Sequence, residues 1–223
     1  TSMEKYRIKV RLLSDAIFGS GNAVPGVVDA DVLHDENGFP YMKGKTLKGK
    51  IKEEFVHLCK CRSGAASLRP SDEESVERLF GKADSDIDGK LYISDLKAEQ
   101  QLRDFFAEMM KASAGTEDAI TPDDILDSMT AIRSFTAIDY RTGVAKEGAL
   151  RRIRVINKDL VFYAQVQTME KLSPHDEALL GASVAALRYL GTMETRGKGL
   201  VECRLMEDDE DITERCVRML REV

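Results

Sequence analysis

The chain has 223 residues and a net charge of −6, with 43% hydrophobic and 32% charged residues. These values are ordinary for a globular protein that buries a sizeable core. No apolar run approaches the roughly 20 residues that a membrane-spanning helix needs, and the N-terminal segment has no signal-peptide core. We therefore expect a cytoplasmic protein with no membrane partner.

The cysteines do not predict a disulfide-rich or metal-bound fold. Cys59, Cys61, Cys203 and Cys216 are too few and too scattered for the disulfide framework of a secreted protein, so we expect reduced thiols. Cys59, Cys61 and the nearby His57 could supply three zinc ligands. A tight zinc site usually has four, and no fourth ligand lies nearby in the sequence, so the pattern disfavours zinc.

The charge is unevenly distributed, and its distribution matters more than its sum. Residues 41–62 carry seven Lys and Arg against two acids, residues 133–158 carry seven against two, and residues 71–127 carry sixteen acids against six bases. A polyanion needs only a local cluster of Lys and Arg, because phosphate contacts there release counterions. The two basic segments are candidate nucleic-acid contacts, although solvated protein faces would give the same pattern.

The first predicted elements are a strand and a helix. Apolar and basic residues alternate over residues 6–12 with the period of a half-buried strand. Thr46 can cap a helix whose apolar stripe runs to Leu58. This helix places Lys48 and Lys52 on one face, where they could follow a phosphate backbone.

The middle of the chain predicts an interruption of the core. Residues 91–94 form a short predicted strand, and residues 96–128 predict two helices with most of the acidic charge. We interpret residues 96–130 as an acidic helical insertion. Residues 131–153 follow it as a polar excursion.

The last third of the chain predicts a strand, a helix and a strand. Alternating apolar residues at 160–166 indicate the first of these strands. Ser173 is suited to cap the helix, with proline in its first turn, and Gly191 is suited to end it in a left-handed conformation. A strand at 200–205 and a short helix at 212–222 complete the chain.

The order β-α-(insertion)-β-α-β, with short and partly polar strands, predicts an α+β fold with a ferredoxin-like core, the core of RNA-recognition motifs. We expect a single domain over residues 1–223. Fold alone does not establish function, so the sites carry the functional argument.

Three sequence blocks resemble those of the RAMP superfamily. They are GVVDADVLHDENGFPYMKGKTLKGK at 26–50, LFG at 79–81 with GKLYISD at 89–95, and GTMETRGKGLV at 191–201; a further block, TAIDYRTGVAK, stands at 136–146. Within the superfamily, the chain most resembles the Csm-like and Cmr-like backbone subunits of type III CRISPR effector complexes. The block at 136–146 resembles the thumb with which those subunits contact target RNA.

The resemblance implies a subunit that binds guide RNA and single-stranded target RNA, and that contacts other subunits and copies or homologues of itself in a filament. The implied RNA-binding residues are Lys45, Lys48, Lys52, Arg196, Gly197, Lys198 and Gly199, with Arg141 and Lys146 in the thumb. The glycine-rich loop also has a physical interpretation. Glycines at 197 and 199 permit positive φ and let backbone N–H groups approach phosphate, although a tight helix-to-strand turn is the simpler alternative.

Asp29 is the candidate catalytic residue. It lies in an otherwise small and apolar segment, where a carboxylate needs either a partner or a task. In the family that the chain resembles, this position carries the acid that cleaves target RNA, through attack of the RNA 2′-hydroxyl with a divalent cation, Mg²⁺ or Mn²⁺. Asp31 and Asp35 are nearby competitors, and a structural role for Asp29 in the turn after Gly26 is the alternative.

An acidic loop at 84–95 nearly matches an EF-hand calcium site. Asp84, Asp86 and Asp88 have the required spacing, Gly89 follows them, and Asp95 stands where Glu is usual. The predicted strand at 91–94 overlaps this segment. We therefore prefer an acidic turn that leads into a strand.

Three functions remain open from the sequence. The first is a guide-RNA-binding subunit with metal-dependent endoribonuclease activity on target RNA. The second is an architectural RNA-binding subunit in which Asp29 is inert, and the third is a calcium-responsive acidic protein unrelated to RNA.

Overall fold

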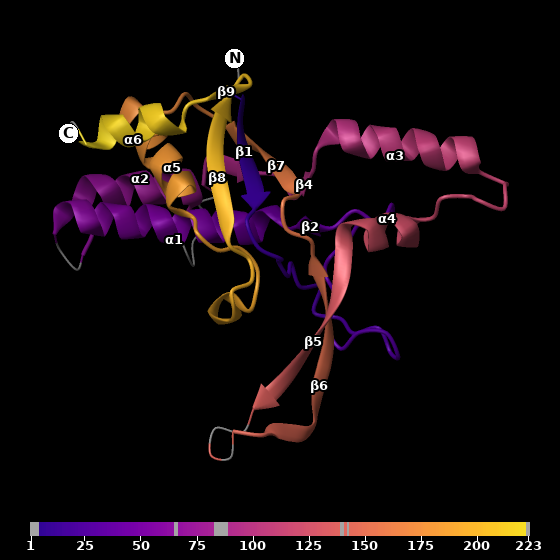
Figure 1. The fold of residues 1–223 in the computed structure, drawn as a ribbon. Coiled ribbons are helices and arrows are strands. Elements are labelled where there is room, and N and C mark those ends of the chain that lie inside the picture. The colour runs from indigo at the N-terminus through magenta and orange to yellow at the C-terminus, as the bar shows by residue number, and fades with distance from the viewer. Residues whose placement is uncertain (1–4, 65–66, 83–88, 139–140, 142, 222–223) are drawn as a thin grey trace.

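The computed structural model of the chain describes residues 5–64, 67–82, 89–138, 141 and 143–221. Helices cover one side of a central antiparallel sheet, and a helical arm and a long hairpin extend away from it (Figure 1). The sheet contains β1 (Lys5–Leu12), β2 (Tyr41–Met42), β3 (Leu91–Ile93), β4 (Leu96–Ala98), β7 (Val161–Thr168), β8 (Val201–Glu207) and β9 (Glu210–Asp211). No helix in the described part of the chain is long and apolar enough to cross a membrane.

The sheet has the strand order of a ferredoxin-like fold. β1 pairs with β7 on one side and with β8 on the other, β3 pairs with β7, and every pairing is antiparallel. The order β8-β1-β7-β3, with α1 after β1 and α5 after β7, is the order of a βαββαβ unit. The predicted α+β, ferredoxin-like fold is therefore confirmed.

The alternation in the two central strands places the core. Tyr6, Ile8, Val10 and Leu12 of β1 are buried, and so are alternate residues of β7 from Phe162 onward. Successive side chains on a strand point to opposite faces, so this period directs one face of the sheet to the helices. The two strands predicted from alternation are present.

The helices of the body are α1 (Gly44–Ser63), α2 (Pro70–Phe80), α5 (Pro174–Ala186) and α6 (Thr213–Arg221). Helices α1 and α5 pack side by side on the sheet, and α6 packs on α5. The sequence did not lead us to expect α2. Its Arg78 forms an ion pair of 2.5 Å with the buried Asp176 of α5, which joins α2 to the body.

The ends of two helices differ from our expectation. Thr46 does not cap α1, which begins two residues earlier, where the carboxylate of Asp95 accepts a hydrogen bond of 2.9 Å from the N–H of Gly44. Ser173 caps α5 as predicted, but α5 ends at Ala186 rather than at Gly191. Gly191 has a φ of 98° and lies against the backbone of Ile17, where any Cβ would clash with a carbonyl oxygen.

The insertion is an arm of two helices. These are α3 (Gln100–Ser113) and α4 (Pro122–Met129), and α3 lies at the end of the molecule opposite α6 (Figure 1). The expected start at residue 96 is wrong, because residues 96–98 form β4 and pair with β2 and β7 in the core sheet. Leu96 is fully buried, and this burial keeps the segment in the sheet.

The polar excursion is a β-hairpin. Its strands are β5 (Thr130–Ile138) and β6 (Ala145–Ile156), and they project from the body in Figure 1. Reciprocal backbone hydrogen bonds of 3.0 and 2.7 Å between Ala16 and Ile156 fasten the base of the hairpin to the segment that follows β1.

The acidic loop at 84–95 does not have the surroundings of an EF-hand. Asp84, Asp86 and Asp88 lie outside the described residues. The segment after them is β3 rather than a helix, and Asp95 is used to cap α1. An EF-hand needs a helix after the loop, so the calcium interpretation loses its support.

Candidate functional site

The loop that carries Asp29 pairs with the outer edge of β6. The N–H of Asp29 donates to the carbonyl of Arg152 at 2.7 Å, and the N–H of Arg152 donates to Oδ2 of Asp29 at 2.7 Å. The N–H of Arg154 donates to the carbonyl of Ala30 at 3.1 Å. Asp29 therefore docks its loop on the hairpin rather than capping the turn after Gly26, and its side chain remains exposed.

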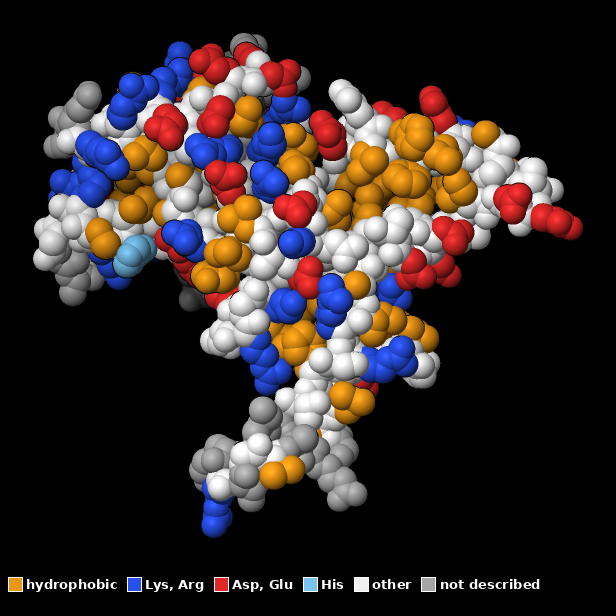
Figure 2. Space-filling model, viewed as in Figure 1, with side chains coloured by type: hydrophobic (Ala, Val, Ile, Leu, Met, Phe, Trp, Pro, Cys, Tyr) orange, Lys and Arg blue, Asp and Glu red, His pale blue; other side chains and the backbone are white. Residues whose placement is uncertain are grey.

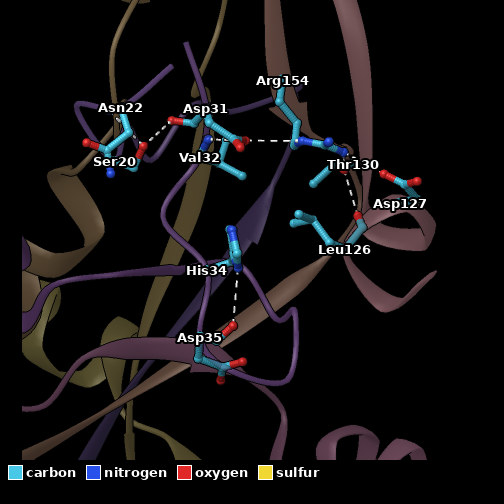
Figure 3. Close-up of polar contacts among 10 residues, drawn as sticks. All are labelled: Ser20, Asn22, Asp31, Val32, His34, Asp35, Leu126, Asp127, Thr130 and Arg154. Atoms are coloured by element: carbon cyan, nitrogen blue, oxygen red, sulfur yellow. Dashed lines mark hydrogen bonds and ion pairs between the residues drawn. The ribbon is translucent and has the colours of Figure 1, made fainter. Parts of the chain in front are cut away.

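The two neighbouring carboxylates are held in structural contacts, and Figure 3 shows those of Asp31. Asp31 is 7% exposed, and its Oδ1 lies 3.1 Å from Nε of Arg154 and accepts a hydrogen bond of 2.8 Å from the N–H of Val32. Asp35 accepts two backbone N–H groups and forms an ion pair of 2.8 Å with Arg103. Of the three aspartates, Asp29 is the one whose carboxylate faces solvent.

Asp29 could hold a cation only with help from a substrate. In the described part of the chain, no group of three or more His, Cys, Asp or Glu residues is placed to hold a metal ion. Mg²⁺ commonly keeps several waters and is bound by one or two carboxylates together with substrate phosphates. Asp29, which has no described donor to its Oδ1, fits a site of that kind, with RNA phosphate as the second ligand.

Arginines surround the base of the hairpin. Arg133 and Arg151 belong to its two strands, and Arg196 belongs to the short helix η1 (Glu194–Arg196) in the facing loop. A cavity of about 490 Å³ between hairpin and loop is lined by Arg151 and Arg196 together with the apolar Phe135 and Met193. Figure 2 shows Lys and Arg side chains gathered around this base. Such a surface suits a nucleic acid, because cations meet phosphates and apolar groups meet bases.

The glycine-rich loop is not a backbone phosphate cradle. Gly197 and Gly199 have positive φ, as expected. The backbone N–H groups of residues 196–199 all donate within the protein, however, to the carbonyls of Met193, Glu194 and Asp15. The N–H groups of residues 196–199 thus belong to a tight turn and are not available to an anion, and the side chain of Arg196 is exposed there.

Lys198 is held by Asp15. Its Nζ lies 3.1 Å from Oδ2 of Asp15, and the Asp15 carboxylate also lies 3.4 Å from Nε of Arg133. Burial alone would raise the pKa of Asp15, but the hydrogen bond and charge of Lys198, the N–H of Lys158 and the charge of Arg133 together lower it. This carboxylate therefore ties the glycine-rich loop to the hairpin.

The lowered pKa gives a pH-dependent stability. A carboxyl whose pKa is lower in the folded than in the unfolded chain stabilises the fold above its ordinary value of 3.8, and this contribution is lost as the pH falls through the lowered pKa. We expect Lys198→Met to lower the free energy of unfolding by about 1–2 kcal/mol at pH 7. When urea unfolding is measured at several pH values, the difference in the free energy of unfolding between Lys198→Met and the wild type should shrink below pH 4. A difference that stays constant down to pH 2 would contradict this role of Asp15.

Lysines of α1 divide into two groups. Lys48 donates to the carbonyl of Leu91 at 2.6 Å, and Lys52 donates to the carbonyl of Gly81 at 3.2 Å. The two side chains that we expected to follow a phosphate backbone thus contact the protein. Lys45 is exposed as the prediction requires. The sequence analysis missed Lys43 and Lys50, which line a second cavity of about 250 Å³ beside the glycine-rich loop.

The remaining predicted positions are less well placed. Arg141 lies exposed near the tip of the hairpin, and the side chain of Lys146 lies outside the described residues.

Cys59 faces the core, where burial and the charge of Asp72 raise the pKa of its thiol to about 11. His57 and Cys61 lie on the exposed side of α1, 3.5 Å apart. The three side chains therefore do not converge.

Comparison with known proteins identifies the family and supports the fold. A family model described as the RAMP superfamily matches residues 9–202. A chain of the structure titled "Type III-B Cmr-beta Cryo-EM structure of the Apo state" is similar, with a TM-score of 0.63, 15% identity, and coverage of 93% of this chain and 99% of that one. A chain of the structure titled "Cryo-EM structure of the Type III-B Cmr-beta bound to cognate target RNA" is also similar, with a TM-score of 0.63, 14% identity, and coverage of 96% of this chain and 98% of that one. No curated protein sequence matches. Since the family model spans most of the chain, the chain belongs to the RAMP superfamily.

Proposed function

We propose that this protein is a guide-RNA-binding backbone subunit of a type III CRISPR effector complex and that it cleaves target RNA through Asp29. The observation that carries the proposal is the position of Asp29. It is an exposed carboxylate at the base of a basic hairpin, while Asp31 and Asp35 are held in ion pairs. Membership in the RAMP superfamily and the similarity to chains of a Cmr-beta complex support the assignment.

The guide RNA would follow the surface between α1 and the glycine-rich loop. Lys43 and Lys50 line the cavity at one side of this surface, Lys45 is exposed on α1, and Arg196 lies at the other side. The target would pass the hairpin and reach Asp29 at its base. Copies or homologues of the chain and other subunits of the complex would extend this RNA-binding surface along the guide.

The proposed reaction is attack by the RNA 2′-hydroxyl on the adjacent phosphate, which forms a 2′,3′-cyclic phosphate and breaks the bond from phosphorus to the 5′-oxygen of the next nucleotide. That oxygen takes up a proton from water and leaves as a 5′-hydroxyl. Asp29 would accept the proton of the 2′-hydroxyl or hold a divalent cation, which would stabilise the charge that develops on the phosphate. The Arg152 N–H fixes one carboxylate oxygen and leaves the other directed to solvent. Arg151, the residue before Arg152 on β6, is exposed and would add positive charge to the hairpin.

The test uses the assembled complex with guide RNA, a complementary target and Mg²⁺ or Mn²⁺. We expect products with 2′,3′-cyclic phosphate and 5′-hydroxyl ends, because the nucleophile is internal to the RNA. A single 2′-deoxy substitution at the cut site should block cleavage while the target still binds. Cleavage of that substituted target would contradict the proposed chemistry.

A purely architectural subunit is the rival function. Lys48, Lys52 and Lys198 contact the protein, so RNA binding would rest on fewer cations than the sequence indicates, yet it needs no carboxylate. Guide and target binding without any cleavage dependent on this subunit would favour that function.

A further inference from the structure

The helical arm exposes an apolar stripe that nothing in the described chain covers. In α3, Leu102, Phe106 and Met110 turn toward the body, whereas Phe105 is 56% exposed and Met109 is 37% exposed. Figure 2 shows hydrophobic side chains gathered over this helix. Exposed apolar patches often mark interaction surfaces, and aromatic side chains are more frequent in protein interfaces than on the rest of the surface.

The arm is also strongly acidic. Glu108, Glu117, Asp118 and Asp123 are exposed and have no cationic partner in the described part of the chain. Two arms would repel each other, so a symmetric contact between the arms of two copies is disfavoured. A partner must offer apolar groups surrounded by positive charge.

A surface with those properties lies at the opposite end of the molecule (Figure 1). A groove of about 420 Å³ between α6, β8 and the end of α5 contains Arg188, Arg218 and Arg221. All three are exposed, and none contacts a carboxylate among the described residues. A fourth arginine in the groove, Arg204, is already paired with Glu202 and Glu214, the two acids of the lining.

The groove has an apolar floor that suits the stripe on α3. Leu13 is 44% exposed at its edge, and Leu187, Val201 and Val217 line it. Figure 2 shows the same pattern in the region of α6, where basic side chains surround an apolar patch. Charge and hydrophobicity of the two surfaces are therefore complementary.

We propose that the acidic arm of one copy docks into the arginine groove of the next copy. Phe105 and Met109 cover the groove floor, and Glu117 and Asp118 meet Arg218 and Arg221. Because the two surfaces lie at opposite ends of one chain, the contact is heterologous and repeats from copy to copy rather than closing as a two-fold dimer. The inference rests on the proposed function in naming copies of the chain as the partner.

The experiment is sedimentation velocity of the purified chain without RNA over a range of concentrations. The wild type should self-associate. Phe105→Ala with Met109→Ala, and separately Arg218→Glu with Arg221→Glu, should weaken association at least about tenfold. Glu117→Lys with Asp118→Lys, at the exposed tip of the arm, tests the arm without changing any packed residue. Lys60→Glu, a single charge reversal on the exposed face of α1 and outside both surfaces, is the control and should associate like the wild type.

Mixing the variants gives the sharpest result. The arm variant keeps its groove and the groove variant keeps its arm, so an equal mixture should form dimers and nothing larger. A wild type that stays monomeric throughout, or variants that associate like the wild type, would overturn the inference. So would a groove variant that associates normally and loses RNA binding, because the groove would then be an RNA surface. Since no assay here uses cleavage, the inference and the proposed function can fail separately.

Discussion

Asp29→Ala and Asp29→Asn are both expected to lower the rate of target cleavage by about 10²–10⁴-fold in the assembled complex, the usual contribution of a positioned acid or base. Asparagine keeps an oxygen that can accept the 2.7 Å hydrogen bond from the N–H of Arg152 but removes the charge. Loss of cleavage in both variants would therefore identify the charge, and not the docking of the loop, as the requirement. The measurement is single-turnover cleavage of a labelled complementary RNA.

Guide and target binding should remain near the wild-type level in both variants. A carboxylate contributes nothing attractive to a polyanion, and its removal should slightly ease RNA binding. Glu36→Gln is the matched control, since Glu36 is another exposed acid of the same segment and should cleave normally. Wild-type rates in both Asp29 variants would contradict the role of Asp29. Loss of cleavage in Asp31→Ala would then move the role to Asp31, and wild-type rates in that variant as well would leave the protein a scaffold in the complex.

The sheet could be predicted from the sequence because its signals are local. The alternation from Tyr6 to Leu12 specifies which face of β1 is buried, and Ser173 lies where the first turn of α5 needs an acceptor. The start of α1 could not be predicted in this way. Its cap is Asp95, 51 residues away in the sequence, and only the folded sheet brings that carboxylate to Gly44.

The RNA-binding residues were harder to predict than the fold. Spacing correctly placed Lys48 and Lys52 on one side of α1, but it could not say that this side faces the carbonyls of Leu91 and Gly81. Glycines in the loop at 191–199 correctly indicated positive φ. Whether the N–H groups there are available depends on acceptors such as the Asp15 carbonyl, which lies in a distant part of the sequence.

The arginine pattern in β6 held a usable signal that we overlooked. Side chains at 151 and 153 point to one face of the strand, and those at 152 and 154 point to the other. Arg154 is the buried member of this run and Arg151 is exposed. An arginine within an otherwise apolar strand end indicates a buried acidic partner, but the sequence alone does not say which aspartate supplies it.

Arg154→Met is expected to lower the free energy of unfolding by about 3 kcal/mol, because it leaves a buried carboxylate without its counter-charge. The side chains of Asp31 and Arg154 are 8% and 10% exposed, and Arg154 also donates to Asp127 at 2.6 Å and to Thr130 at 3.1 Å. Methionine fills much of the arginine volume, so the loss of stability would come from the unpaired carboxylate rather than from a cavity. Urea unfolding measures it, with Arg151→Met as the exposed control on the same strand, expected within about 0.5 kcal/mol of the wild type.

The double variant Arg154→Met with Asp31→Asn separates charge from packing. Asparagine can still accept the 2.8 Å hydrogen bond from the N–H of Val32 and carries no charge, so the double variant should recover about 1 kcal/mol or more relative to Arg154→Met alone. A double variant no more stable than the single one would show that the uncompensated charge is not the cause. Because Asp31 lies two residues from Asp29 in the loop that pairs with β6, the single variant should also slow cleavage, and the double variant should regain part of that rate.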